Sequence, residues 1–404
     1  MNHLKIGIVG GGIAGSAAAH FLSRQGHDIT VFEKKAIPQP IGSGIMLQPS
    51  GLKVFKLLGL ENVVFDNASS ICSFVGSNAI DKKVIDIDFR MLNASISCYG
   101  VHRGLLFHSL VNSLKNLKNI TQINGANVTA INQIQALSTI KTEEGEYKGF
   151  DLVLVTSGAA SKLRDSFKVN KVSKQQQVSA IWATLKYDKG EVKEGQITQF
   201  YDNGVLGGLM PIGKNPLDNS GKSIVNFFWG VNQKSNPIIS ESDFKNIKEK
   251  FYKSFKNYDH IIDKIETRDQ LTFSPYYDSK LGSYYEGNVA FLGDVAHAMS
   301  PQLSSGTNLA LLDAYEFSEC IKSNNSIVEA LKEYSRKRQK QAKYCQLVSK
   351  YVTPVFQGDK DHSFIRDTLI QKIYEFPLTR NIMLRTLLGI QTGIFSSLDK
   401  RYYI

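Results

Sequence analysis

Three glycines near the N-terminus, Gly10, Gly12 and Gly15, have the spacing of a turn that binds the phosphates of a dinucleotide. They follow an apolar run, residues 4–9, that is typical of a buried strand, and they precede a small-residue, apolar stretch that is typical of a helix. In such a turn the first glycine permits a sharp bend. The second lets the backbone approach a pyrophosphate, and the third lets the helix pack closely on the sheet. The free N–H groups at the start of the helix then favour the negative phosphates.

An acidic residue at the end of the next strand-like run completes this unit. Residues 28–32 form the run, and Glu33 follows Gly15 by 18 residues, about where a carboxylate accepts hydrogen bonds from a ribose. A carboxylate there disfavours a 2′-phosphate, so the unit predicts FAD or NAD rather than NADP. The alternative is a glycine-rich turn without a ligand. It has less support, because strand, turn, helix, strand and acid occur in the expected order.

A second segment, residues 287–308, predicts a site for the same ligand. A strand-like run leads into Gly293, Asp294 and His297, and the chain then continues through Pro301 to Gly306. Together with the first segment it resembles the class A flavoprotein monooxygenases, the para-hydroxybenzoate hydroxylase-like family, over the chain from its N-terminus to about residue 320. The resemblance decides between the two nucleotides and implies FAD.

The resemblance also implies roles for individual residues. Asp294 should hold the ribityl chain, the backbone of residues 306–308 should face the isoalloxazine at a helix start, and Arg103 should contact FAD. His297, within the same motif, is better interpreted as structural than as a base, and we assign no catalytic residue and no metal site. The complete set of cofactor-binding residues that we predict is Gly10, Gly12, Ala14, Gly15, Glu33, Lys34, Arg103, Val128, Asp294, Gly306, Thr307 and Asn308.

The implied reaction is hydroxylation of an aromatic or similarly electron-rich small molecule, with NADH or NADPH and O₂ as co-substrates, through a flavin C4a-hydroperoxide. Two departures from the family pattern leave other functions open. Ser157 stands where the family has an Asp, and Ser304-Ser305 stands where it has Gly-Gln. The alternatives are an FAD-dependent dehydrogenase or reductase that inserts no oxygen, and a non-catalytic flavin-binding protein docked on a membrane.

The fold that we predict is α/β: a Rossmann-like FAD-binding domain, an inserted and mostly antiparallel sheet domain for the substrate, and a helical C-terminal segment. The FAD-binding domain comprises residues 1–70, 100–175 and 276–325, the substrate domain 71–99 and 176–275, and the helical segment 326–404. Short strand-like runs parted by turn residues indicate the inserted sheet. Its candidate substrate-pocket residues are Tyr201, Met210, Phe228 and Trp229, for each of which a place in the core of the sheet is the alternative.

Composition limits the remaining possibilities. The 404 residues are 42% hydrophobic, as in a globular protein, and four cysteines without close pairing indicate reduced thiols in a cytoplasmic protein. The strand-like run begins so early that we expect no cleaved signal peptide. Residues 322–404 hold 15 Lys/Arg against 7 Asp/Glu, out of a net charge of +11 for the chain. This excess predicts either a solvated helix face or peripheral contact with an anionic membrane that supplies a lipophilic substrate. No nucleic-acid-binding motif accompanies it.

Overall fold

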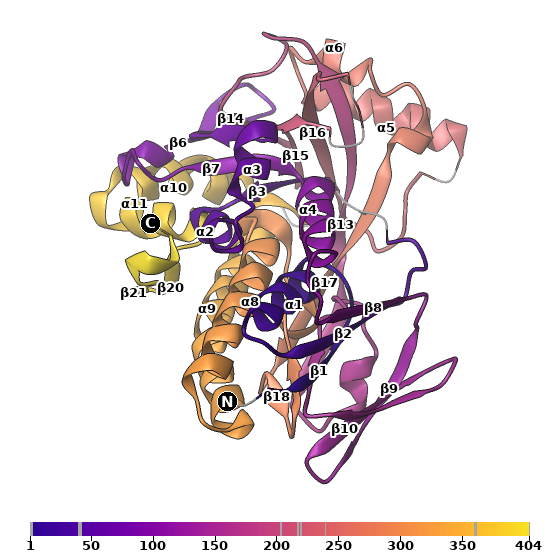
Figure 1. Cartoon of the computed structure of the whole chain (residues 1–404). Coiled ribbons are helices and arrows are strands. Elements are labelled where there is room, and N and C mark those ends of the chain that lie inside the picture. Colours follow the sequence, from indigo (N-terminus) through magenta and orange to yellow (C-terminus); the bar gives the residue numbers. More distant parts are fainter. Residues whose placement is uncertain are drawn as a thin grey trace.

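A parallel sheet with an antiparallel edge strand forms the centre of the lower half of the molecule in Figure 1. The computed structural model describes residues 3–38, 43–202, 204–215, 218, 220–238, 240–358 and 362–403. The order of the six strands is β18 (Tyr285–Glu286), β19 (Val289–Phe291), β12 (Leu152–Val155), β1 (Lys5–Val9), β2 (Asp28–Glu33) and β8 (Ile120–Asn124). All pairs except β18–β19 are parallel. The chain leaves β1 at the centre of this sheet, where ligands bind in open α/β folds.

Both faces of this sheet are covered, which explains its continuous apolar runs. All four residues of β12 are fully buried. Helix α1 (Ile13–Arg24) lies between α4 (Arg103–Leu114) and α8 (Gly306–Ser323). A three-stranded antiparallel sheet, β11 (Glu146–Phe150), β10 (Leu137–Thr142) and β9 (Val128–Ile134), covers the other face, since Ile140 and Phe150 pack against the backbone of Gly7.

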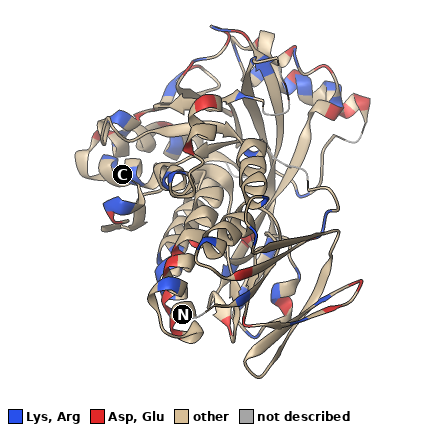
Figure 2. Ribbon diagram, viewed as in Figure 1, with Lys and Arg blue, Asp and Glu red and all other residues tan. Residues whose placement is uncertain are grey.

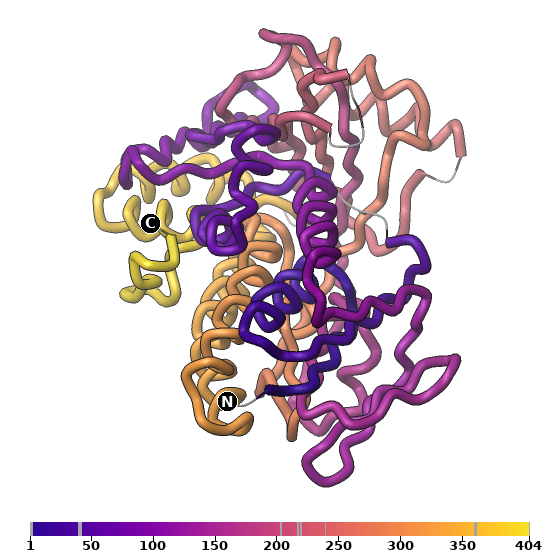
Figure 3. The backbone as a smooth tube through the Cα atoms, viewed as in Figure 1, coloured from indigo at the N-terminus to yellow at the C-terminus, as the bar shows by residue number. Residues whose placement is uncertain are grey.

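A seven-stranded sheet forms the upper half, and only its β14–β5 pair is parallel. It combines two segments that are far apart in the sequence, which Figure 3 shows as strands of different colour side by side. The strand order is β17 (Thr272–Leu281), β13 (Lys171–Tyr187), β16 (Ser223–Val231), β15 (Val205–Lys214), β14 (Gln196–Asp202), β5 (Ser73–Asn78) and β6 (Lys83–Asp88). Helices α5 (Glu241–Ser254) and α6 (Asp259–Ile262) cover one face.

Smaller elements join the two halves. A three-stranded sheet consists of β3 (Gly44–Leu47), β7 (Cys98–His102) and β4 (Ser69–Ile71), and helices α2 (Pro49–Leu58) and α3 (Glu61–Asn67) connect β3 to β4. Helix α7 (Asp294–His297) follows β19. Single turns of 3₁₀ helix occur at η1 (Phe89–Met91), η2 (Leu163–Ser166), η3 (Arg268–Gln270), η4 (Pro301–Leu303) and η5 (Lys400–Tyr402).

The C-terminal segment is mainly helical, as predicted. The long helix α9 (Ile327–Phe356) runs along the lower half, α10 (Ser363–Glu375) turns back against β6, and α11 (Pro377–Leu387) packs against α10 (Figure 1). A two-stranded hairpin of β20 (Gln391–Gly393) and β21 (Ser396–Ser397) follows. The predicted fold class is therefore confirmed, while the exact division into domains stays a prediction. Within the described part of the chain, no helix is both long enough and apolar enough to cross a bilayer.

Candidate flavin site and adjoining cavity

The glycine turn lies at the carboxyl edge of the parallel sheet, and its backbone is tightly packed. Gly10 has φ +110°, and a Cβ atom there would lie 2.8 Å from the carbonyl oxygen of Thr156, at the end of β12. A Cβ atom at Gly15 would clash with the carbonyl oxygen of Gly10. The hydroxyl of Thr156 donates to the carbonyl oxygens of Val9 (3.0 Å) and Gly10 (2.7 Å). Gly10 and Gly15 are thus required by packing alone.

Gly12 differs from these two glycines, because a Cβ atom there would meet nothing within 4 Å. It is the N-cap of α1, and no side chain caps this helix. The first N–H groups of α1 therefore face open space that a Cβ atom would partly fill. This arrangement fits a pyrophosphate, which approaches the backbone closely and accepts hydrogen bonds at a helix start.

Glu33 lies beside the same turn. Its carboxylate accepts a hydrogen bond from the N–H of Gly11 (2.9 Å) and another from the N–H of Lys35 (2.9 Å), which fixes the carboxylate at the end of β2. Carboxylate oxygens have further lone pairs, so a ribose hydroxyl can still donate to them. Lys34 is exposed next to it, and Val128 is half-buried in β9, two residues after Ala126, whose N–H donates to the carbonyl oxygen of Glu33.

The second segment meets the first at Gly293. This residue has φ +74°, and a Cβ atom there would lie 3.3 Å from the Cβ of Ala14 on α1. Asp294 starts α7, and one of its carboxylate oxygens would lie 3.6 Å from a Cβ atom at Gly306, the first residue of α8. Like α1, α8 has no side chain capping its N-terminus. Two uncapped helix starts and two carboxylates therefore border one edge of the sheet, which fits a ligand that has phosphates at one end and a ring at the other.

Asn308 ties the start of α8 to the segment around β3. Its carboxamide oxygen accepts from the N–H of Gln48 (2.9 Å), and its nitrogen donates to the carbonyl oxygens of Met46 (3.0 Å) and Ser304 (2.8 Å). The Asn308 side chain is therefore fully engaged in the protein, whereas Thr307 is half-buried. Since β3 pairs with β7, these bonds also connect α8 to Arg103, which is exposed at the start of α4 directly after β7.

The two departures from the family pattern, at Ser157 and at Ser304-Ser305, both lie in loops at the ends of β12 and η4. Ser304 adopts a left-handed conformation with φ 51°, which favours glycine and costs a serine roughly 1–2 kcal/mol. The turn before α8 thus follows a path suited to glycine although the residue is serine. The hydroxyl of Ser157 donates to that of Ser161 (2.6 Å) and holds the loop after β12.

A buried ionic cluster holds the second segment, residues 287–308, in place through the N–H of Gly293. The carboxylate of Asp313 on α8 accepts from the N–H of Gly293 (2.9 Å) and from the guanidinium of Arg338 on α9 (2.7 Å), and it lies 2.6 Å from Nε2 of His297. Burial raises the pKa of Asp313, but His297 and Arg338 outweigh this effect and bring it down to about 2. His297 is fully buried, in agreement with the structural role that we expect for it.

Arg338 is the residue of this cluster that we did not predict, because it lies in the basic run that we interpreted as a solvated or membrane-facing surface. It is 4% exposed. Its neighbour Lys337 forms ion pairs with Glu316 of α8 (2.6 Å) and Glu333 of α9 (2.9 Å), in a part of the molecule where acidic and basic side chains lie close together (Figure 2). The sequence did contain a signal: Arg338 falls four residues after Tyr334 and seven before Cys345, on the apolar stripe of the helix.

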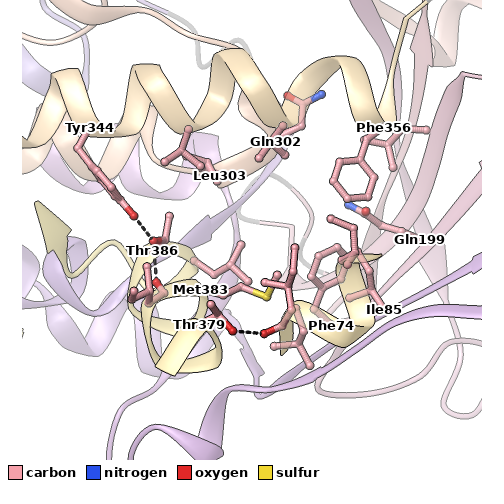
Figure 4. Close-up of a pocket in the computed structure, with 18 residues that line it drawn as sticks. Phe74, Ile85, Gln199, Gln302, Leu303, Tyr344, Phe356, Thr379, Met383 and Thr386 are labelled. Atoms are coloured by element: carbon pink, nitrogen blue, oxygen red, sulfur yellow. Dashed lines mark hydrogen bonds between the residues drawn. The ribbon is translucent and has the colours of Figure 1, made fainter. Parts of the chain in front are cut away.

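An apolar cavity of about 330 Å³ adjoins this site (Figure 4). Its near wall is Gln302 and Leu303 of η4, just before the turn into α8. The sheet strands β5, β6, β14 and β15 form a second wall, and α9, α10 and α11 complete it. The volume is at the lower end of the range found for small-molecule sites, about 300–1,000 Å³.

The four predicted pocket residues do not line this cavity. Trp229 packs against Phe251 and Phe255, on the face of the sheet that α5 covers. Tyr201 is 1% exposed and its ring lies 5.2 Å from that of Phe356. Met210 and Phe228 belong, with Tyr201, to the apolar cluster on the opposite face of the sheet, which also contains Phe356 and Leu384. Much of the cavity wall comes from the C-terminal helices, to which we assigned no pocket residue, because no local motif indicates where those helices pack.

Comparison with known proteins agrees with the geometry. The family model described as "FAD binding domain" matches residues 3–346. Among curated relatives, the "Probable 2-heptyl-3-hydroxy-4(1H)-quinolone synthase" of Rhodococcus erythropolis is 24% identical, over 81% of this chain and 82% of the relative. The 6-hydroxynicotinate 3-monooxygenase of Pseudomonas fluorescens is 22% identical, over 82% and 87%.

Solved structures show the same fold. HpxO of Klebsiella pneumoniae, complexed with FAD and uric acid, superposes with a TM-score of 0.79 at 20% identity, covering 96% of this chain and 97% of HpxO. The tetrameric form of 2-methyl-3-hydroxypyridine-5-carboxylic acid oxygenase gives a TM-score of 0.77 at 20% identity, covering 98% and 100%. The predicted cofactor FAD and the predicted resemblance are therefore confirmed. The chain belongs to the FAD-binding-domain family, whose members include the class A FAD-dependent monooxygenases.

Proposed function

We propose that this protein hydroxylates a small aromatic molecule at FAD, with NADH or NADPH and O₂ as co-substrates. The observation that carries the proposal is the position of the apolar cavity, which begins at η4, three residues before the start of α8 where we place the isoalloxazine. FAD, when bound, would supply the redox and oxygen chemistry. The names of the relatives support a ring substrate, since they refer to a quinolone and a nicotinate.

The protein's own contribution is to bind, orient and exclude water. The start of α8 offers N–H groups and the positive end of a helix dipole, which stabilise negative charge on a ring placed there. Asp294 and Glu33 would hold the hydroxyl groups of the ribityl chain and the ribose. The apolar walls of the cavity keep water away from the reacting atoms, which protects reactive species from hydrolysis.

Anaerobic stopped-flow spectroscopy tests this function. We expect NADH or NADPH to bleach the oxidised-flavin absorbance when an aromatic ligand is bound, and we expect the reduced protein then to consume O₂. Failure of both nucleotides to reduce the flavin with any aromatic ligand would exclude the hydroxylase. Reduction without use of O₂ would favour the dehydrogenase or reductase.

We also propose that α10 and α11 rest on an anionic membrane surface. Three large apolar side chains there are strongly exposed, Phe364 (77%), Phe376 (61%) and Leu378 (60%), and Lys372 and Arg385 are exposed beside them. Exposed apolar groups next to basic residues are typical of peripheral membrane contact. Lys337 and Arg338 on α9 do not contribute, because both have acidic partners.

Vesicle co-sedimentation tests this contact. We expect the double variant Phe376→Ser/Leu378→Ser to bind phosphatidylserine-containing vesicles about 30-fold more weakly than wild type or weaker still, because each lost apolar side chain removes about 1–3 kcal/mol of burial. The matched control is Val328→Ser/Leu347→Ser, which changes two exposed apolar residues on α9. Equal binding by both double variants would rule the contact out. Substitutions are preferable to deleting the tail, since Leu384, Leu388 and Ile390 are buried in the core.

A further inference from the structure

The cavity between the seven-stranded sheet and the C-terminal helices has a chemistry of its own. Its walls are apolar, with Phe74 and Ile85 from the sheet, Val348 from α9, Ile370 from α10 and Met383 from α11 (Figure 4). No Asp, Glu, Lys or Arg is among the residues that line it in the described part of the chain. A charged group would lose its hydration there without compensation, so the cavity favours an uncharged, apolar group.

The hydroxyls that line the cavity already have partners. The hydroxyl of Thr386 donates to the carbonyl oxygen of Ile382 (2.7 Å) and lies 2.7 Å from the hydroxyl of Tyr344. The hydroxyl of Thr379 donates to the carbonyl oxygens of Ile373 and Phe376. Because these hydroxyls are satisfied within the protein, they offer a ligand little beyond apolar contact.

The carboxamide of Gln302, at the η4 end of the cavity, is engaged outside it. It donates to the carboxamide oxygen of Gln357 (3.3 Å), which does not line the cavity, and its own oxygen is buried in the protein. The cavity therefore offers a ligand mainly apolar contact, from η4 to the space between α10 and α11.

From this apolar lining we infer that the substrate is an aromatic ring bearing a saturated hydrocarbon chain. The ring lies at the η4 end, beside the flavin, and the chain lies between α10 and α11. This inference rests on the proposed function for the place of the ring, and it adds a site for the chain. The far end reaches the surface at Ile373, which lines the cavity and is 42% exposed, so a chain can enter there.

Calorimetric titration of the FAD-loaded protein with 4-n-alkylphenols, from ethyl to octyl, tests the inference. We expect the Kd in wild type to fall about fourfold per added methylene, the fold-change that corresponds to burial of about 0.8 kcal/mol per CH₂. Met383→Trp should abolish this dependence for the longer chains, because the indole fills the cavity.

Leu378→Trp is the matched control, since it adds an indole to the same helix at a residue outside the cavity. It should bind the whole series as wild type does. A Kd that does not change with chain length, or the same dependence in Met383→Trp as in Leu378→Trp, would overturn the inference. Reduction of the flavin by NADH or NADPH with 4-ethylphenol is measured in parallel. If the flavin is not reduced but the Kd still falls with chain length, the proposed function is wrong and the site for the chain stands. If the flavin is reduced but the Kd does not change with chain length, only the site for the chain is ruled out.

Discussion

Substituting Gly12 by alanine should abolish tight FAD binding and leave the apoprotein folded. Gly12 has φ −71°, which alanine adopts without strain, and a Cβ atom there meets nothing in the protein. The added methyl group would instead occupy the space of the pyrophosphate and separate it from the N–H groups of α1. Hydrogen bonds to charged groups contribute about 1.5–3 kcal/mol each, so we expect FAD affinity to fall about 100-fold or more. Titration of FAD into apoprotein measures this loss.

Two further glycines make the comparison specific. Gly15→Ala should lower both FAD affinity and the unfolding free energy of the apoprotein, because its Cβ atom clashes with the carbonyl of Gly10 and overpacking costs about 1–3 kcal/mol. Gly145→Ala, on a surface turn with nothing within 4 Å, should change neither quantity. If Gly12→Ala bound FAD as tightly as wild type, the phosphates would not lie at this turn.

The second large effect is expected from Asp313→Asn, which should cost about 3–5 kcal/mol of unfolding free energy. The substitution keeps the shape of the side chain but leaves the buried guanidinium of Arg338 without its counter-charge. It also weakens the hydrogen bond that holds the N–H of Gly293, so FAD binding should weaken as well. Urea unfolding measures the loss. Asp269→Asn is the control, because Asp269 is 92% exposed and its substitution should change stability by less than about 0.5 kcal/mol.

The difference in unfolding free energy between wild type and Asp313→Asn should depend on pH in a definite direction. The pKa of Asp313 is about 2 in the folded protein, where His297 and Arg338 outweigh the effect of burial, against an ordinary value of 3.8. A lowered pKa contributes stability that is fully present above about pH 4 and is lost as the pH falls toward 2. The advantage of wild type over Asp313→Asn should therefore shrink across this range. A difference that stays constant down to pH 2 would contradict the ionic role of Asp313.

Much of the cofactor site could be predicted because its determinants are local. Gly10, Gly12 and Gly15 are close in the sequence and have fixed roles in a turn, and Glu33 follows at a spacing that the strand and helix lengths dictate. The strands of the inserted sheet were also predictable, since alternation and turn residues mark them. For Asn308, by contrast, the motif indicated its position near the flavin but not its hydrogen-bond partners. Its hydrogen bonds to Met46 and Gln48 join segments about 260 residues apart.

The apolar cavity could not be predicted for a related reason. Its walls combine a few residues each from the sheet, η4, α9, α10 and α11, and no short pattern indicates that α10 returns to β6 or that α11 packs on α10. Aromatic residues such as Trp229 attracted attention by their type, yet Trp229 packs under α5. Arg338 was misjudged because a basic run usually indicates solvent, whereas its partner Asp313 lies on another helix. Burial of a charge becomes predictable only when both partners are known.

The central claim is that the protein inserts oxygen into an aromatic ring, and incorporation of ¹⁸O tests it most directly. FAD-loaded protein is incubated with NADH or NADPH, ¹⁸O₂ and a panel of hydroxylated aromatic compounds that includes the 4-n-alkylphenols, and the products are analysed by mass spectrometry. We predict a product that carries one ¹⁸O atom with wild type and none with Gly12→Ala. Oxidation of the nucleotide with all of the oxygen recovered as hydrogen peroxide, and no labelled product from any compound, would contradict the account.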